Sequence, residues 1–299
     1  MVQDRRWKRA EQSRYRENVV EKALVLGGGG VTGVAWEIGM LAGLADIGLD
    51  LTDADLVIGT SAGSIVGVDV RSGVRLAELY EVQTRPPGAG DSYAKMGFGV
   101  LAKYVRAMVF SRKPDVARVR VGTMALRART ESEDARRRVI ASRLPISEWP
   151  AGRLQITAVD ALTGDLVVFD AASGVRLLDA VGASCAVPGI WPPVTINGRR
   201  YIDGGIASAA NADLAEGCGS VVLIAPLVSS FGAMASPVRQ ASKLAESGAR
   251  VSLVKPDKAA LRAIGRNVLN PARRPDSARA GYAQAASVAD DVKAVWWAS

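Results

Sequence analysis

Continuous apolar runs that end in glycine-rich turns recur near the start of the chain. Residues 23–26 form one such run and stop at four successive glycines, and residues 55–58 lead directly into a second glycine turn. A short apolar run of this kind is typical of a strand buried on both faces. Helically spaced apolar residues follow each run, over 33–47 and from residue 65 onward. Two strand–turn–helix units predict a parallel sheet covered by helices.

The later part of the chain continues to alternate between strand-like and helix-like segments. Residues 154–159 and 166–169 are joined by a Thr-Gly-Asp turn, which predicts a hairpin. The remaining expected elements are a helix at 177–184, a rigid proline-rich loop at 187–193, strands at 199–202, 220–225 and 251–254, and closing helices over 257–299. We therefore expect an α/β fold, a three-layer α/β/α sandwich with a mainly parallel central sheet.

Composition changes at the start of the chain and in one internal stretch. Residues 1–22 are charged and poor in apolar side chains, which indicates an N-terminal arm. Residues 23–299 are expected to form a single domain, large enough to hold an active site, with a helical insertion at about 84–150. Within the insertion, residues 98–109 have the spacing of a basic amphipathic helix, and residues 134–139 predict a solvated helix. A basic helix of this kind either packs on its own domain or lies on a membrane surface.

The overall composition is that of a globular protein, with 48% hydrophobic and 23% charged residues. The longest apolar runs fall far short of the ~20 residues that a membrane-spanning helix needs. No apolar segment follows the charged N-terminus, so a secretory signal is not expected either. We expect a cytoplasmic protein, with peripheral contact at a membrane as an open alternative.

The net charge of +8 favours anionic partners such as phospholipid headgroups. Nucleic acid is not expected, because aromatic residues make up only 5% and no arginine-glycine-aromatic motif occurs. The two cysteines, Cys185 and Cys218, lie among apolar or small residues and are expected to be buried free thiols. The chain has no histidine, so these cysteines do not indicate a metal site, and no residue calls for an organic cofactor.

The first glycine turn is a candidate anion site. Gly28, Gly30 and Gly33 fit the pattern G-x-G-x-x-G, in which backbone amides point at an anion beside a helix N-terminus. The anion is either a pyrophosphate or the oxyanion of an acyl-transfer intermediate. A dinucleotide site expects an acidic residue at the end of the next strand, but this strand ends in Gly59, Thr60 and Ser61. That ending counts against a dinucleotide.

Ser61 is a candidate nucleophile, because Gly59-Thr60-Ser61-Ala62-Gly63 matches G-x-S-x-G between a predicted strand and a predicted helix. The alternative is a serine that only caps the helix. A serine in this motif normally passes its proton to a histidine, which this chain lacks. Either Ser61 is not a nucleophile, or a carboxylate serves as its base.

Asp203 is the candidate carboxylate, followed by Gly204 and Gly205 at the end of a predicted strand. The alternative is an ordinary Asp-Gly turn. An aspartate near its usual pKa of about 3.9 is ionised at neutral pH and can accept a hydroxyl proton. Because it is a weak base, catalysis would depend on a preorganised oxyanion site.

A glycine loop, a G-x-S-x-G serine and a later Asp-Gly-Gly, in this order and without a required histidine, resemble the patatin-like phospholipases. The resemblance runs from about residue 24 to residue 213 and includes the segment 183–188 and Asn211. It implies the fold of that family and hydrolysis of lipid acyl esters by a serine–aspartate dyad. It makes Ser61 the nucleophile and Asp203 the base. The oxyanion-hole donors that it implies are the amides of Gly28, Gly29 and Gly30, and the glycines that it implies support the motifs are Gly33, Gly59, Gly63, Gly204 and Gly205.

One position departs from the family pattern, since many members have a basic loop residue where this chain has Thr32. The change leaves the backbone donors in place but removes a charge near the oxyanion. Two other functions stay open: a nucleotide-binding protein that uses the glycine loop, and a catalytically silent membrane-surface module of the same fold. The sequence leaves acyl transfer, the lipid class, the acyl position and the oligomeric state undetermined. The expected substrate is a phospholipid or another acyl-ester lipid.

Overall fold

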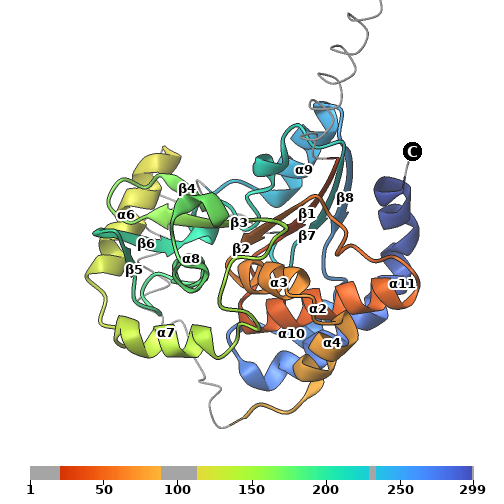
Figure 1. Ribbon diagram of the computed structural model, residues 1–299, viewed down its shortest axis with the longest axis horizontal. Coiled ribbons are helices and arrows are strands. Elements are labelled where there is room, and N and C mark those ends of the chain that lie inside the picture. The colour runs from red at the N-terminus through yellow and green to blue at the C-terminus, as the bar shows by residue number, and fades with distance from the viewer. Residues whose placement is uncertain (1–20, 89–112, 229–233, 298–299) are drawn as a thin grey trace, which may run out of the picture.

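The computed structural model describes residues 21–88, 113–228 and 234–297. The strands are β1 (Lys22–Leu26), β2 (Leu56–Thr60), β3 (Arg153–Asp160), β4 (Leu166–Phe169), β5 (Val194–Ile196), β6 (Arg199–Asp203), β7 (Ser220–Ile224) and β8 (Arg250–Val254). They form one sheet in the order β5-β6-β3-β2-β1-β7-β8, with β4 paired to β3 (Figure 1). The pairs along β3, β2, β1, β7 and β8 are parallel, and β4, β5 and β6 pair antiparallel. The sheet is therefore mixed and mostly parallel, as predicted.

The α-helices of the described residues are α2 (Gly30–Asp46), α3 (Ala62–Arg71), α4 (Leu76–Thr84), α6 (Pro114–Leu126), α7 (Glu133–Ala141), α8 (Leu177–Ser184), α9 (Pro237–Glu246), α10 (Lys258–Ile264) and α11 (Arg274–Trp296). Helix α2 begins within the glycine loop, three residues before the predicted start. Strand β5 and helices α4 and α9 were not predicted, because they are short and only part of each is apolar. None of these helices combines the length and apolar character that a bilayer crossing requires.

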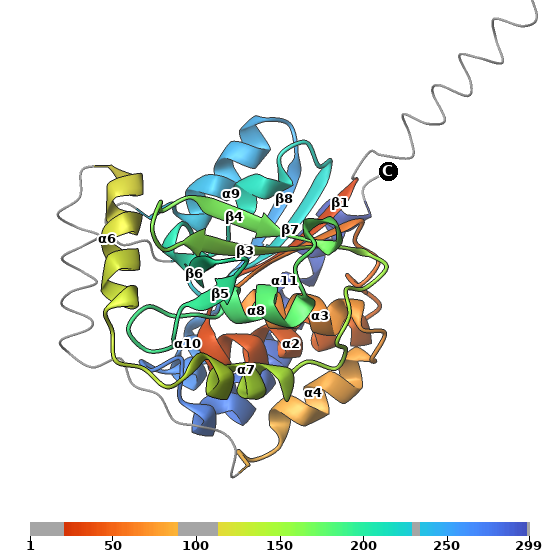
Figure 2. The ribbon, with the colours of Figure 1, turned by 60° about the vertical axis from the view of Figure 1, so that its left-hand side comes forward.

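Alternating residues of the central strands bury side chains in two layers of core. Leu24 and Leu26 of β1 belong to the larger cluster, which is shared with α2, α3, α8 and α11. Ala23 and Val25 point to the other face, where α9 closes a smaller cluster. Figure 2 shows α9 on one side of the sheet and α2, α3 and α8 on the other. The result is the three-layer α/β/α arrangement that the sequence predicts.

The register along β3 brings two strand ends together. Thr60, the last residue of β2, pairs with Thr157, and Asp203, the last residue of β6, pairs with the next residue, Ala158. Strand β2 runs parallel to β3, and β6 runs antiparallel to it. The ends of β2 and β6 therefore reach the middle of β3 from opposite directions. Ser61 follows Thr60 directly, and the sheet therefore places Ser61 next to Asp203.

Helices α6 and α7 lie within the predicted insertion at about 84–150. Helix α6 buries Ala117, Val121 and Ala125 against residues of β3 and β6. Helix α7 packs beside α8, as Figure 2 also shows. The amphipathic helix predicted over 98–109 lies outside the described residues, and so does nearly all of the predicted arm at 1–22. The described part of the insertion is helical and packs over one end of the sheet.

Candidate active site

Ser61 lies at the sharp turn between β2 and α3, with backbone angles φ 53° and ψ −115°. A non-glycine residue rarely adopts a positive φ, and such strain is typical of functional turns. The turn also packs tightly against β1, since a Cβ atom at Gly63 would lie 2.1 Å from the carbonyl oxygen of Leu26. At Gly59 a Cβ atom would lie 2.5 Å from the Gly63 carbonyl oxygen. The two glycines of the motif are thus required for this geometry.

The side chains of Ser61 and Asp203 form a direct hydrogen bond. The Ser61 Oγ donates to Oδ2 of Asp203 over 2.7 Å. The other carboxylate oxygen, Oδ1, accepts the backbone N–H of Gly205 at 2.7 Å. Asp203 is 5% exposed. Both oxygens of this buried carboxylate therefore have a donor, and one of the donors is the serine predicted as nucleophile.

Burial raises the pKa of Asp203 to about 6, and hydrogen bonds from Ser61 and Gly205 and the positive charge of Arg136 oppose this rise. The sequence had predicted a carboxylate near its ordinary pKa, and that prediction is wrong because the side chain is withdrawn from water. At pH 7 the carboxylate is still mostly ionised. Its pKa now lies in the range that suits a general base acting near neutrality.

The glycine loop uses some of its amides within the fold. Gly28, predicted as one of the oxyanion donors, donates its N–H to the carbonyl oxygen of Ala209 at 2.6 Å in this structure. Gly29 caps α2 and Gly30 is its first residue, with φ 61°. Within the described residues the amides of Gly29 and Gly30 have no acceptor. Gly33 donates to the Gly29 carbonyl, which fixes the first turn of α2.

The end of α8 holds the backbone of Ser61. Ser184 is fully buried, and its Oγ accepts the Ser61 N–H at 2.8 Å. The Ser61 carbonyl oxygen accepts Ser64 Oγ at 2.6 Å and the Cys185 thiol at 3.3 Å. Burial raises the pKa of Cys185 to about 11, so it remains a neutral thiol. Cys185 and Cys218 are both buried and free, as predicted.

Asn211 joins the turn after Asp203 to the ends of β2 and β3. Its side-chain amide donates to the hydroxyl of Thr60 at 3.0 Å and to that of Thr157 at 3.2 Å. It also donates to the carbonyl oxygens of Gly204 and Ser208. Gly204 packs directly on this group, because a Cβ atom there would lie 2.3 Å from Thr157 Oγ1. The network fixes the position of Asp203 relative to Ser61.

Arg136 is a site residue that the sequence did not identify. The helix predicted over residues 134–139 was expected to be solvated, which is wrong at Arg136, since this residue of α7 is buried. The Arg136 guanidinium stacks on the ring of Trp191, with 3.8 Å between its Cζ and the ring centroid. Arg136, Trp191 and Ser61 line the same small pocket. Burial lowers the pKa of Arg136 to about 10, so it still carries a positive charge at neutral pH.

Among the described residues, no three side chains of the His, Cys, Asp or Glu type gather closely enough to hold a metal ion. The site thus combines a strained serine hydrogen-bonded to a buried carboxylate, two backbone amides with no acceptor in the described part of the chain, and a nearby guanidinium.

Comparison with solved structures finds VipD from Legionella pneumophila at a TM-score of 0.44 and 14% sequence identity. That match covers 91% of this chain and 67% of VipD. The type III effector protein ExoU matches at a TM-score of 0.40 and 15% identity, over 92% of this chain and 53% of its own. The model of the family described as patatin-like phospholipase matches residues 24–216, which run from β1 to just beyond Asp203 and Asn211. The chain thus belongs to the patatin-like phospholipases, a family of lipid hydrolases.

Proposed function

We propose that the chain cleaves the carboxylic esters of lipids with Ser61 as nucleophile and Asp203 as its base. The observation that carries this proposal is the 2.7 Å hydrogen bond between the two side chains, in a member of the patatin-like phospholipases. A nucleophilic serine needs an adjacent base, and the chain has no histidine to supply one. The buried carboxylate is the group placed to do so.

The reaction follows from these contacts. As Ser61 Oγ attacks the ester carbonyl carbon, its proton passes to Asp203. The carbonyl oxygen becomes an oxyanion, which accepts hydrogen bonds from the Gly29 and Gly30 amides at the positive end of α2. The intermediate collapses to an acyl-enzyme, and the leaving alcohol takes the proton from Asp203. Water then attacks the acyl carbon and gives a proton to Asp203. As this second intermediate collapses, Asp203 returns the proton to Ser61 Oγ, and the fatty acid is released.

Arg136 supplies positive charge that the glycine loop lacks. Thr32 stands where many family members have a basic residue, and its hydroxyl donates to the Val268 carbonyl oxygen at 3.2 Å. The guanidinium of Arg136 comes from helix α7 and lines the pocket of Ser61. It lowers the pKa of Asp203 and so favours the ionised base. We assign to Arg136 the electrostatic role that Thr32 cannot have.

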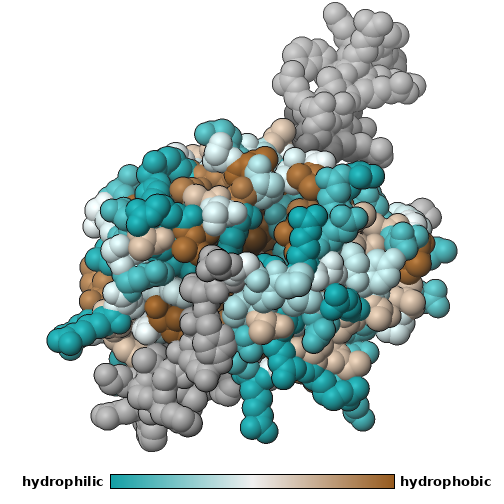
Figure 3. Space-filling view, turned by 90° about the horizontal axis from the view of Figure 1, so that it is seen from below, coloured by the Kyte–Doolittle hydropathy of each residue, from teal (hydrophilic) through white to brown (hydrophobic). Residues whose placement is uncertain are grey.

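The acyl-ester substrate brings the protein to a lipid surface, and we propose a peripheral contact with anionic lipid. The net charge of +8 supports this assignment. The face in Figure 3 is largely hydrophilic, with smaller apolar patches between the polar side chains. Val82 of α4 and Leu261 of α10 are 46% and 56% exposed. We place the catalytic domain at residues 23–299, because α11 near the C-terminus packs against α2 beside the glycine loop.

A nucleotide site is the less favoured alternative. The amide of Gly28 already donates to Ala209, and that of Thr32 donates to the carbonyl oxygen of Val268 at 3.1 Å. A pyrophosphate would need several such amides at once. The hydrogen bond between Ser61 and Asp203 has no part in nucleotide binding, whereas acyl transfer requires it.

A fluorophosphonate probe and p-nitrophenyl esters test the proposal together. The probe is expected to label the wild-type protein at Ser61 and to leave Ser61→Ala unlabelled. Asp203→Asn keeps the shape of the side chain but cannot accept the proton, so kcat/KM is expected to fall by about a thousandfold or more. Ser242→Ala, at an exposed position on α9, is the matched control and should match the wild type. Undiminished ester hydrolysis by a folded Asp203→Asn protein would contradict the dyad.

A further inference from the structure

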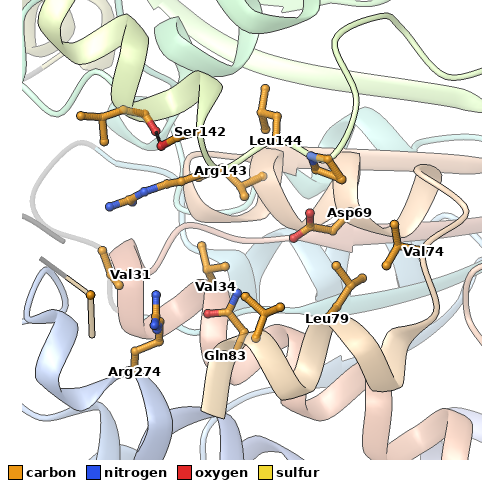
Figure 4. A pocket seen from close by; sticks show the side chains of 15 residues that line it. Val31, Val34, Asp69, Val74, Leu79, Gln83, Ser142, Arg143, Leu144 and Arg274 are labelled. Carbon is orange, nitrogen blue, oxygen red and sulfur yellow. Dashed lines mark hydrogen bonds between the residues drawn. The ribbon is translucent and has the colours of Figure 1, made fainter. Parts of the chain in front are cut away.

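A cavity of about 550 Å³ adjoins the pocket of Ser61. Its walls come from α2, α3 and α4 and from the end of α7 with the segment that follows it (Figure 4). Val31, Val34, Ile65 and Arg143 line both the cavity and the Ser61 pocket. The volume lies within the range of sites that hold small ligands. A chain attached to Ser61 therefore has a space to enter directly beside it.

Helix α3 runs from the Ser61 pocket toward the adjoining cavity, since it contributes residues to both. Ser61, Ile65 and Asp69 are spaced four residues apart and so lie along one side of the helix. At a rise of about 1.5 Å per residue, Asp69 lies about 12 Å beyond Ser61 along the helix axis. An extended acyl chain covers that length with roughly ten carbon–carbon bonds, each about 1.5 Å long and set in a zigzag.

The carboxyl group of Asp69 is an unexpected feature of this cavity. Asp69 is 4% exposed, and among the described residues its side chain has no hydrogen-bond or ion-pair partner. Figure 4 shows it at the end of the cavity where Val74, Leu79 and Leu144 lie. An unpartnered buried carboxyl group is destabilising, and an apolar side chain would serve an ordinary acyl chain better. Burial raises the pKa of Asp69 to about 8, so at neutral pH the group can both donate and accept a hydrogen bond.

We propose that Asp69 recognises a hydroxyl group, or a comparable oxygen substituent, carried by the substrate's acyl chain roughly ten bonds from the ester carbonyl. The inference rests on the proposed function, because it seats the acyl chain of the Ser61 ester in the cavity. A site that hydrogen-bonds a substrate hydroxyl discriminates strongly against the analogue without it, since the buried polar group is then left unpaired. The substrate class is thus an ester of a mid-chain oxygenated fatty acid.

The kinetic test compares the p-nitrophenyl esters of octadecanoic acid and of its 10-hydroxy derivative. For the wild type, kcat/KM is expected to be at least about tenfold higher for the hydroxylated ester. In Asp69→Leu the ratio of the two values should fall to about one, because the hydrogen bond to the acyl-chain hydroxyl is lost. Asp290→Leu replaces an exposed aspartate of α11 and is expected to keep the wild-type ratio. A wild-type ratio near one, or an unchanged ratio in Asp69→Leu, would overturn the proposal.

A binding measurement separates this proposal from the proposed function. Isothermal titration calorimetry of the two free fatty acids, below their micelle concentrations, needs no turnover. The wild type should bind the hydroxylated acid at least about tenfold more tightly, and Asp69→Leu should bind both alike. Preferential binding through Asp69 without ester hydrolysis would refute the hydrolase and keep the subsite. Equal hydrolysis and equal binding of the plain and hydroxylated forms would refute the subsite and keep the hydrolase.

Discussion

Two buried aspartates lie toward opposite ends of helix α3, and they differ in what surrounds them. Asp203 lies beside Ser61 at the start of the helix, where both of its oxygens accept hydrogen bonds and Arg136 adds positive charge. Asp69 lies near the end of the helix and has no partner among the described residues. Burial raises the pKa of Asp203 to about 6 and that of Asp69 to about 8. Burial alone yields a neutral acid, whereas burial with donors yields a base that is ionised near neutral pH.

The largest expected difference between the two carboxyl groups is in the pH dependence of the reaction, where kcat/KM should depend on the ionisation of Asp203. The proposed mechanism needs Asp203 to be ionised before it accepts the Ser61 proton. The value of kcat/KM should therefore fall as pH decreases through about 6. With one essential ionisation, the loss between pH 7 and pH 4 is about a hundredfold. Hydrolysis of a short-chain p-nitrophenyl ester, measured where the protein remains folded by circular dichroism, gives the profile. A flat profile over this range would exclude Asp203 as the base.

Asp69 should instead make stability depend on pH between about pH 4 and pH 8. Its folded pKa is raised, so the stability linked to its proton is fully present below the unfolded pKa of about 4 and is lost as pH rises to about 8. Asp69→Asn lacks this ionisation, so its stability relative to the wild type should rise by about 3 kcal/mol between pH 6 and pH 9. Urea unfolding at the two pH values measures the gain. Asp290→Asn, at an exposed site, is the control and should show none. A constant difference between Asp69→Asn and wild type would mean that Asp69 does not titrate in this range.

Removing the positive charge of Arg136 should raise the pKa of Asp203 toward that of Asp69. Arg136→Met keeps an apolar chain against Trp191 but removes the charge that lowers the pKa of Asp203. The acid limb should shift to higher pH, and kcat/KM at pH 7 should fall by about tenfold. Arg138→Met on the exposed side of the same helix is the matched control. If both variants gave the wild-type profile, Arg136 would have no electrostatic role in the reaction.

The polar pair at the start of α3 could be predicted from the sequence, but its electrostatic surroundings could not. Apolar runs located the ends of β2 and β6, and these ends bring Ser61 and Asp203 together through their register on β3. Arg136 was missed because its burial depends on how α7 packs beside α8 and Trp191. The pKa of Asp203 was missed for the same reason, since local sequence does not reveal how completely a side chain is withdrawn from water.

The glycine loop and Asp69 show a similar limit. The spacing of the glycines indicates an anion site, but only the tertiary structure shows that Gly28 donates to Ala209, far along the chain. Asp69 stands between Val68 and Val70 on a mostly apolar helix. The pattern marks it as an exception without showing whether it faces solvent, a partner or a cavity. The motifs thus identify the reacting groups, and packing decides their protonation and their donors.

The smallest expected effect concerns the backbone that presents Ser61. Ser184→Ala removes the oxygen that accepts the Ser61 N–H at 2.8 Å and leaves that amide without its partner. Stability should fall by about 1–3 kcal/mol, and kcat/KM by about threefold as the strained turn loosens. Ser173→Ala removes only an exposed side-chain bond and serves as the control in both measurements. Because Ser184 touches neither carboxyl group, the acid limb should stay at the wild-type pH. A shifted limb would mean that the position of Ser61 helps to set the pKa of Asp203, and the contrast with Asp69 would then depend on the turn as well as on the donors.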